Sequence, residues 1–396
     1  MKLILKSTLL LLFAILAMNT SEAQCTQLDD GSWIDASGAP CVNSVVSAVP
    51  FLRIVADARS AGMGDVGLAI SADPNAMHFN ASKLVFAEKK AALSATYTPW
   101  LRSLNLNDVY LAYLTGYFQL DKLQAIGFGL RFFSLGSIQF TDVNGTPLNV
   151  GKPNEFELSL AYSRKLSDYF SAGITGKFIY SNLAAGNETE NGDIIDPAVA
   201  GAADVSFTYK KDDLAVALAL TNIGSKITYT RQIVKDYLPA NIGLGAAYTM
   251  ELDGFNKLTL AADINKLMVP TPCLGTDCDT DPVDGIDDYR QMSPIQGIFS
   301  SFGDAPGGFK EELKELTYSI GAEYWYDDQF AVRAGYFYEH AQKGNRKYFT
   351  VGIGLKYNVF GMNVSYLVPA SSQRNPLDNT FRFSLLFDFE SFKEGE

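Results

Sequence analysis

The sequence has no long hydrophobic run after its first 23 residues, and it has few residues suited to catalysis. Beyond residue 23 no apolar stretch approaches the roughly 20 residues that a transmembrane helix needs. The only histidines are His78 and His340, and neither a G-x-S-x-G nor an H-E-x-x-H motif occurs. The sequence therefore predicts a protein that is not an enzyme and needs no cofactor.

An excess of basic residues is also absent. The chain has 32 Lys and Arg against 44 Asp and Glu, which gives a formal net charge of −12. Proteins that bind nucleic acid usually carry a basic surface that neutralises phosphates. We therefore expect no nucleic-acid partner, and we interpret the acidic residues as a solvated surface.

The first 23 residues have the pattern of a secretory signal peptide. Lys2 and Lys6 precede the apolar run Leu9–Ala17, and Ser21-Glu22-Ala23 is a small-x-small cleavage site. The mature chain is thus expected to start after Ala23 and to lie outside the inner membrane.

Cysteines are scarce, at four in the whole chain. Their expected location is oxidising, where disulfides form and persist. Their spacing suggests two local bridges, although four cysteines allow three pairings. The candidates are Cys25 with Cys41 and Cys273 with Cys278.

What the chain does have is aromatic residues and alternating strands. Aromatics make up 12% of the residues, and segments such as "EFELSLAYS" (155–163) place apolar residues at every second position. Each such strand is about 10 residues long, the length a tilted strand needs to cross a bilayer. The pattern predicts about fourteen strands. They lie near 90–98, 108–118, 123–133, 155–165, 169–181, 198–210, 213–222, 239–250, 256–266, 316–326, 329–339, 346–358, 361–369 and 380–390.

The connections between these strands alternate in length. Tight turns such as Asp121-Lys122 and Asp253-Gly254 alternate with longer loops, including 134–154, 182–197 and 267–315. Outer-membrane barrels have short periplasmic turns and long outer loops, and only a closed sheet satisfies its backbone in lipid. We therefore predict an all-β fold, a transmembrane antiparallel barrel of about fourteen strands over residues 90–396, in the outer membrane.

Two regions fall outside the predicted wall. Residues 24–89 form a tail and a segment that could fold into the lumen as a plug. The loop 267–315 is long enough to be functional or disordered. It contains an acidic stretch that could bind Ca²⁺ or could be merely solvated, since its spacing departs from that of a calcium loop. The candidate ligands are Asp279, Asp281, Asp284, Asp287 and Asp288.

The stretch "AGMGDVG" (61–67) matches G-x-G-x-x-G at Gly62, Gly64 and Gly67. A dinucleotide site needs this motif within a β-α-β unit, and the chain has no such series. Glycine also allows close backbone approach and positive φ. We therefore interpret these glycines as packing positions of a plug.

Residues 53–86 resemble the N-terminal segment of the PorV family, outer-membrane barrels of the Bacteroidetes type IX secretion system in the FadL-like superfamily. The resemblance rests on "DAR" (57–59), "AGMG" (61–64), "DPNA" (73–76) and "NASK" (80–83), and extends from residue 45 to the end. Within the segment it marks the plug residues Arg59, Gly62, Gly64, Gly67, Asn75, Asn80 and Lys83.

The resemblance implies a role in protein export. Such barrels bind secreted proteins through their C-terminal signal domains, dock on a large translocon barrel, and deliver clients to a surface attachment complex that holds a sortase-like protease. Loop 267–315, with 134–154 and 182–197, would then form the client and partner surface, and the wall would contact outer-membrane lipid. The alternative is a FadL-type transporter of hydrophobic compounds.

Overall fold

The computed structural model describes residues 26–27, 33–34, 44–102, 106–141, 144–189, 192–230, 235–272, 286–305, 308–370 and 379–389. The predicted signal peptide, all four cysteines, and the acidic residues Asp279, Asp281 and Asp284 lie outside these residues.

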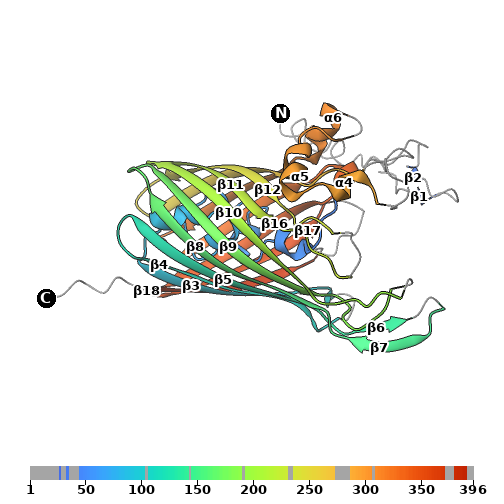
Figure 1. Cartoon of the computed structure of the whole chain (residues 1–396). Coiled ribbons are helices and arrows are strands. Elements are labelled where there is room, and N and C mark those ends of the chain that lie inside the picture. Colours follow the sequence, from blue (N-terminus) through green and yellow to red (C-terminus); the bar gives the residue numbers. More distant parts are fainter. Residues whose placement is uncertain are drawn as a thin grey trace, which may run out of the picture.

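Fourteen antiparallel strands form a closed barrel (Figure 1). Each strand pairs with the next wall strand along the chain, and β18 closes the sheet by pairing with β3. The strand ends agree with the predicted ranges to within two residues, and the all-β barrel fold is confirmed. The wall strands are β3 (Ala91–Pro99), β4 (Val109–Gln119), β5 (Gln124–Leu135), β8 (Asn154–Lys165), β9 (Phe170–Asn182), β10 (Ala198–Lys211), β11 (Leu214–Gly224), β12 (Asn241–Glu251), β13 (Asn256–Leu267), β14 (Thr317–Tyr326), β15 (Phe330–Tyr338), β16 (Lys347–Tyr357), β17 (Phe360–Pro369) and β18 (Phe381–Phe389).

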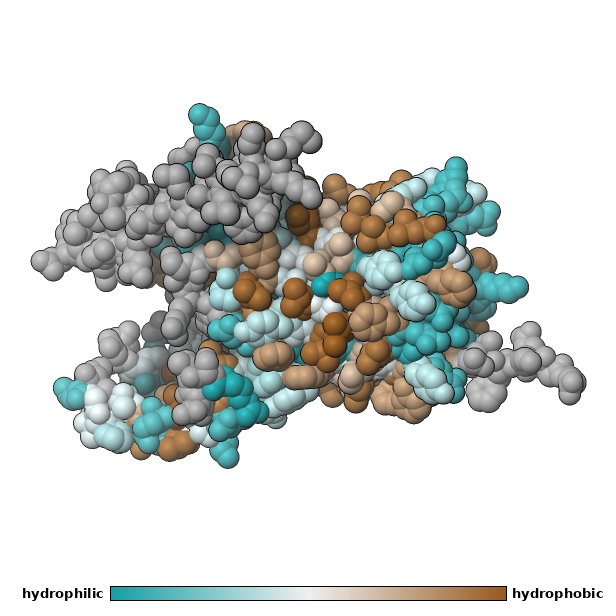
Figure 2. All heavy atoms as spheres, turned by 180° about the vertical axis from the view of Figure 1, so that it is seen from behind, coloured by the Kyte–Doolittle hydropathy of each residue, from teal (hydrophilic) through white to brown (hydrophobic). Residues whose placement is uncertain are grey.

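The period-2 pattern determines which side chains face outward. On β8, Leu158 and Leu160 are exposed, whereas Glu157 and Ser159, which alternate with them, are buried in the lumen. Figure 2 shows hydrophobic side chains gathered over the middle of the wall and hydrophilic ones toward its ends. Paired rings lie near both ends, as in an aromatic girdle; Tyr318 and Tyr338 are one pair at the loop end. The outer face is therefore suited to lipid.

The lumen is occupied by a segment of the same chain, residues 49–86, called the lumen segment below. It contains η1 (Pro50–Arg53), α2 (Ala58–Ala61), α3 (Ala76–Phe79) and η2 (Ala81–Phe86). Asp57 caps α2, since its Oδ2 accepts from Ser60 N at 2.7 Å. These turns are too short to be stable alone, and their order must come from the surrounding wall.

The hydrophobic core lies between the lumen segment and the wall. Phe51 and Leu52 pack with wall residues including Phe133. Met77 and Leu84 pack against β4, β5 and β8. Met63 and Leu68 pack elsewhere, against a patch of small wall side chains: Ala217, Ala219, Ala247 and Ala261. Alanine at these inward positions leaves room for a chain inside the barrel.

The loop-side connections carry additional structure. The predicted loop 134–154 contains a hairpin of β6 (Ile138–Thr141) and β7 (Pro147–Gly151) that projects from the barrel (Figure 1). The predicted loop 267–315 contains α4 (Asp288–Gln291), α5 (Pro294–Ser300), α6 (Phe309–Glu312) and η4 (Leu313–Glu315). Loop 339–346 contains η5 (Ala341–Lys343), and β1 (Thr26–Gln27) pairs with β2 (Trp33–Ile34). Among the described residues, no helix is long and apolar enough to cross a membrane.

Candidate functional site

The three glycines of "AGMGDVG" lie in the lumen, at or near its wall. Gly64 has φ +71°, and a Cβ there would lie 2.5 Å from the backbone N of Tyr336. A Cβ on Gly62 would lie 3.1 Å from Gly352 Cα, and one on Gly67 would meet the Phe79 ring at 2.4 Å. These distances support the interpretation that the glycines permit close packing.

The wall also contributes glycines to this contact. A Cβ on Gly335 of β15 would lie 2.1 Å from Gly64 N, and one on Gly321 of β14 would lie 2.3 Å from Met63 O. Gly321 and Gly335 are cross-strand partners. The lumen segment therefore touches the wall backbone at a paired glycine position. The sequence analysis did not predict this contact, although glycines at paired positions of two adjacent strands are a signal that the sequence contains.

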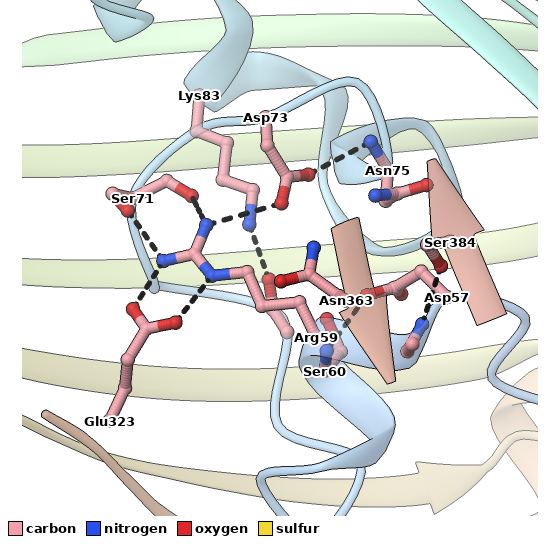
Figure 3. Close-up of polar contacts among 12 residues, drawn as sticks. Asp57, Arg59, Ser60, Ser71, Asp73, Asn75, Lys83, Glu323, Asn363 and Ser384 are labelled. Atoms are coloured by element: carbon pink, nitrogen blue, oxygen red, sulfur yellow. Dashed lines mark hydrogen bonds and ion pairs between the residues drawn. The ribbon is translucent and has the colours of Figure 1, made fainter. Parts of the chain in front are cut away.

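Arg59 is the centre of a buried ion-pair cluster (Figure 3). Its Nε and Nη2 donate to the two carboxylate oxygens of Glu323 on β14, at 2.9 and 2.7 Å. Its Nη1 lies 3.1 Å from Asp73 Oδ2, and its Nη2 donates to Ser71 Oγ at 2.7 Å. Arg333 of β15 donates from Nε to the same Glu323 at 2.7 Å. The bidentate geometry fixes the lumen segment in one orientation against the wall.

The other predicted plug residues bind within the lumen segment or to β10. Lys83 Nζ donates to Gly67 O at 2.5 Å, and burial lowers its pKa to about 8. Asn80 Nδ2 donates to Leu68 O at 2.9 Å and to Thr208 Oγ1 at 2.8 Å. Asn75 is buried, and its backbone N donates to Asp73 Oδ1 at 2.8 Å (Figure 3). All seven predicted residues thus lie inside the barrel, where they contact the lumen segment itself or the wall strands.

Several wall side chains that bind the lumen segment were not predicted. Asp263 Oδ2 accepts from the backbone N of Gly67 and Leu68, at 2.7 and 2.9 Å. Arg131 Nη1 donates to Leu52 O at 3.1 Å, and Arg382 Nε donates to Val55 O at 3.1 Å. Each is a charged residue at an inward position of a strand. That is the signal that could have found them.

Two cavities lie on opposite sides of the lumen segment. One, of about 490 Å³, reaches the short-turn end and is lined by Arg59, Asp73, Lys83, Glu323 and Arg333 among others. The second, of about 140 Å³, reaches the loop end, where Arg53, Asp65, Glu339, Lys343 and Arg346 line it. The segment therefore divides the lumen, and both remaining spaces have charged linings.

A second buried charge cluster anchors the long loop to the barrel rim. Lys266 of β13 bonds to Glu312 at 2.9 Å and to Glu315 at 2.5 Å. Lys343 of η5 bonds to Glu311 at 2.7 Å and to Glu315 at 2.9 Å. Burial alone would raise the pKa of Glu315, but hydrogen bonds from Lys266, Thr271 and Lys343 outweigh it and lower that pKa. Two lysines thereby hold α6 and η4 in place.

Of the proposed calcium ligands, Asp287 and Asp288 are described, at the start of α4. Within the described ranges, no cluster of three or more histidine, cysteine or acidic side chains could hold a metal ion. With the other three candidates outside those ranges, calcium binding stays a hypothesis. Millimolar calcium should slow proteolysis of this loop if the hypothesis is correct.

Comparison with known proteins identifies the family. The model of type IX secretion system protein PorV matches residues 39–274, more than half of the chain. No curated protein was found to match. Among solved structures, the toluene transporter TbuX of Ralstonia pickettii is similar at 12% identity and a TM-score of 0.52, over 84% of this chain and 98% of that one. The toluene transporter TodX of P. putida gives 12% identity and a TM-score of 0.51, over 85% and 99%.

These structural neighbours share the barrel fold, and the family match adds the biological system. A closed fourteen-strand barrel with an apolar outer face is an outer-membrane protein. The chain belongs to the PorV family of the type IX secretion system.

Proposed function

We propose that this barrel binds secreted proteins through their C-terminal signal domains at the translocon and delivers them to a surface attachment complex. The observation that carries the proposal is the occupied lumen. The lumen segment is bonded to the wall on several sides, by Glu323, Asp263 and Arg131. A folded client has no open path through such a barrel, which supports a binding surface at the loop end.

The loop end provides ordered surfaces for such a client. The β6–β7 hairpin projects away from the wall, and Leu148 and Val150 on it are exposed. The long loop is held at the rim by Lys266 and Lys343. The large translocon barrel and the sortase-bearing attachment complex are the further partners in this proposal. The scarcity of histidine and the missing hydrolase motifs support a role without catalysis.

The test separates the two ends of the barrel. Residues 137–151 and, in another variant, 286–305 are replaced by short Gly-Ser linkers. A matched control carries the same linker in the turn at Asp253-Gly254, at the opposite end. Heat-modifiable migration on gels verifies that each barrel is folded.

We expect each loop-side variant to reduce client secretion at least tenfold and to lose co-purification of exported proteins. The control should secrete normally. Normal secretion by both loop-side variants would reject the proposal.

Transport of hydrophobic compounds is the alternative function, and the toluene transporters of the same fold are its support. It predicts an apolar path past the lumen segment. The lining of the 490 Å³ cavity instead includes many charged side chains, such as Arg59, Lys83 and Glu323, beside apolar ones such as Trp325. A charged lining disfavours apolar ligands, so secretion is the function we favour. Bound lipid alone in the purified native protein, without exported proteins, would favour transport.

A further inference from the structure

The helices of the long loop expose an unusually apolar face. On and just after α5, Ile295, Phe299 and Phe302 follow one another at helical spacing, and Phe309 and Leu313 continue the set on α6 and η4. Their exposed fractions are 66%, 74%, 49%, 74% and 48%. Scattered single exposed side chains would be ordinary, but here five large ones follow one another along consecutive short helices.

The opposite side of these helices is fixed to the rest of the protein. Gly297 of α5 is buried, and a Cβ there would lie 2.9 Å from the Tyr237 ring. Tyr237 Oη lies 2.8 Å from both Tyr289 O and Met292 O, and its one proton is shared between these two carbonyl oxygens. Glu312 of α6 is held by Lys266. The apolar face therefore has a defined direction.

These helices lead directly into a wall strand whose outer face is suited to lipid. After Leu313 the chain enters β14, where Tyr318 and Ile320 are exposed on the outside of the barrel. Tyr318 packs near Tyr338, with ring centroids 6.3 Å apart, at the girdle that marks the loop-side interface. In Figure 1, α5 and α6 project beyond the outline of the wall at its loop-side end, beside the barrel.

We propose that α5, α6 and η4 lie in the outer boundary of the membrane, with the five apolar side chains among the lipid acyl chains. Short amphipathic helices bind an interface in this way when their apolar face is buried at the headgroup–acyl boundary. The lipid contact keeps the helices beside the wall. The proposal stands without the client-binding function.

The test uses the purified full-length protein in liposomes whose acyl chains carry bromine, which quenches nearby tryptophan. Phe299→Trp reports the apolar face, and Gln296→Trp, on an exposed position of the same helix, is the matched control. A second pair, Phe309→Trp and Lys310→Trp, repeats the comparison on α6. The signal of the wild-type protein, with its three tryptophans, is subtracted.

We expect at least twofold stronger quenching at positions 299 and 309 than at 296 and 310, with blue-shifted emission. Because no client or translocon is present, a partner protein cannot produce this result. Equal quenching within each pair, with folded barrels verified by heat-modifiable migration, would overturn the proposal. In that case a partner protein covers the apolar face, and crosslinking in cells would identify that partner.

Discussion

The lumen segment and the long-loop helices are built from the same kind of element, helices of one or two turns, but their surroundings differ. Arg59 is buried in the barrel and bonded to Glu323 of the wall. Phe299 of the loop is 74% exposed, on a helix anchored from its opposite side. Order in short helices comes from what packs around them. Inside the barrel the wall encloses the segment, whereas outside it one face is left for lipid.

The comparison predicts the largest effect at the tightest lumen contact. Gly64→Val adds a side chain where φ is +71° and the Tyr336 backbone lies 2.5 Å from the Cβ position. We expect a loss of at least about 3 kcal/mol in unfolding free energy, or a leak measured as conductance. Heat-modifiable migration against temperature measures the first effect.

Gly201→Ala is the matched control, since no atom lies within 4 Å of its Cβ position. Equal stability and conductance of the two variants would show that the segment is not closely packed against the wall.

The next effect concerns the buried ion pairs. Glu323→Gln leaves Arg59 and Arg333 without their shared carboxylate, and removing one partner of a buried pair costs about 3 kcal/mol or more. Lys257→Gln breaks the exposed pair with Asp328 and should cost under about 1 kcal/mol. Urea unfolding of the reconstituted barrels compares them. Similar losses would mean that burial does not strengthen the lumen pair.

A smaller and local effect is expected in the long loop. Lys343→Met leaves Glu311 and Glu315 without one of their lysines. We expect the free energy of opening α6 to fall by about 1–2 kcal/mol, so that protease cuts there roughly tenfold faster. The barrel midpoint should hardly change.

Lys310→Met, at an exposed position of α6 itself, is the matched control. Equal cleavage rates in the two variants would show that Lys343 does not anchor the loop.

The smallest expected effect is the pH dependence of the stability of the folded loop. Because the folded pKa of Glu315 is lowered, its stabilising contribution is complete above its ordinary value of 4.5 and is lost as pH falls through the lower folded value. Asp304 acts oppositely, since burial raises its pKa and its protonation favours the folded loop. Hydrogen exchange of residues 308–316 should therefore accelerate only below about pH 4.5. Glu315→Gln should flatten this profile, and an unchanged profile would contradict the assignment.

Strand positions could be predicted because the pattern that determines them is local. Alternation over about ten residues determines which side chains face lipid, and the tight turns determine where each strand ends. For the same reason the sequence indicated that residues 24–89 lie outside the wall, and the resemblance marked Arg59, Gly64 and Asn80 within them.

The partners of those residues could not be predicted, because they are far away in the chain. Glu323 is 264 positions from Arg59, and only barrel closure brings β14 to it. The same holds for Gly335 against Gly64. The helices of the long loop also lack a strong local signal, since turns of four to seven residues are ordered by their anchors. The sequence by itself thus determined a two-faced strand pattern and an exported barrel. The tertiary structure decided which charges pair, which glycines meet and which apolar face is left exposed, because those contacts exist only after the sheet has closed.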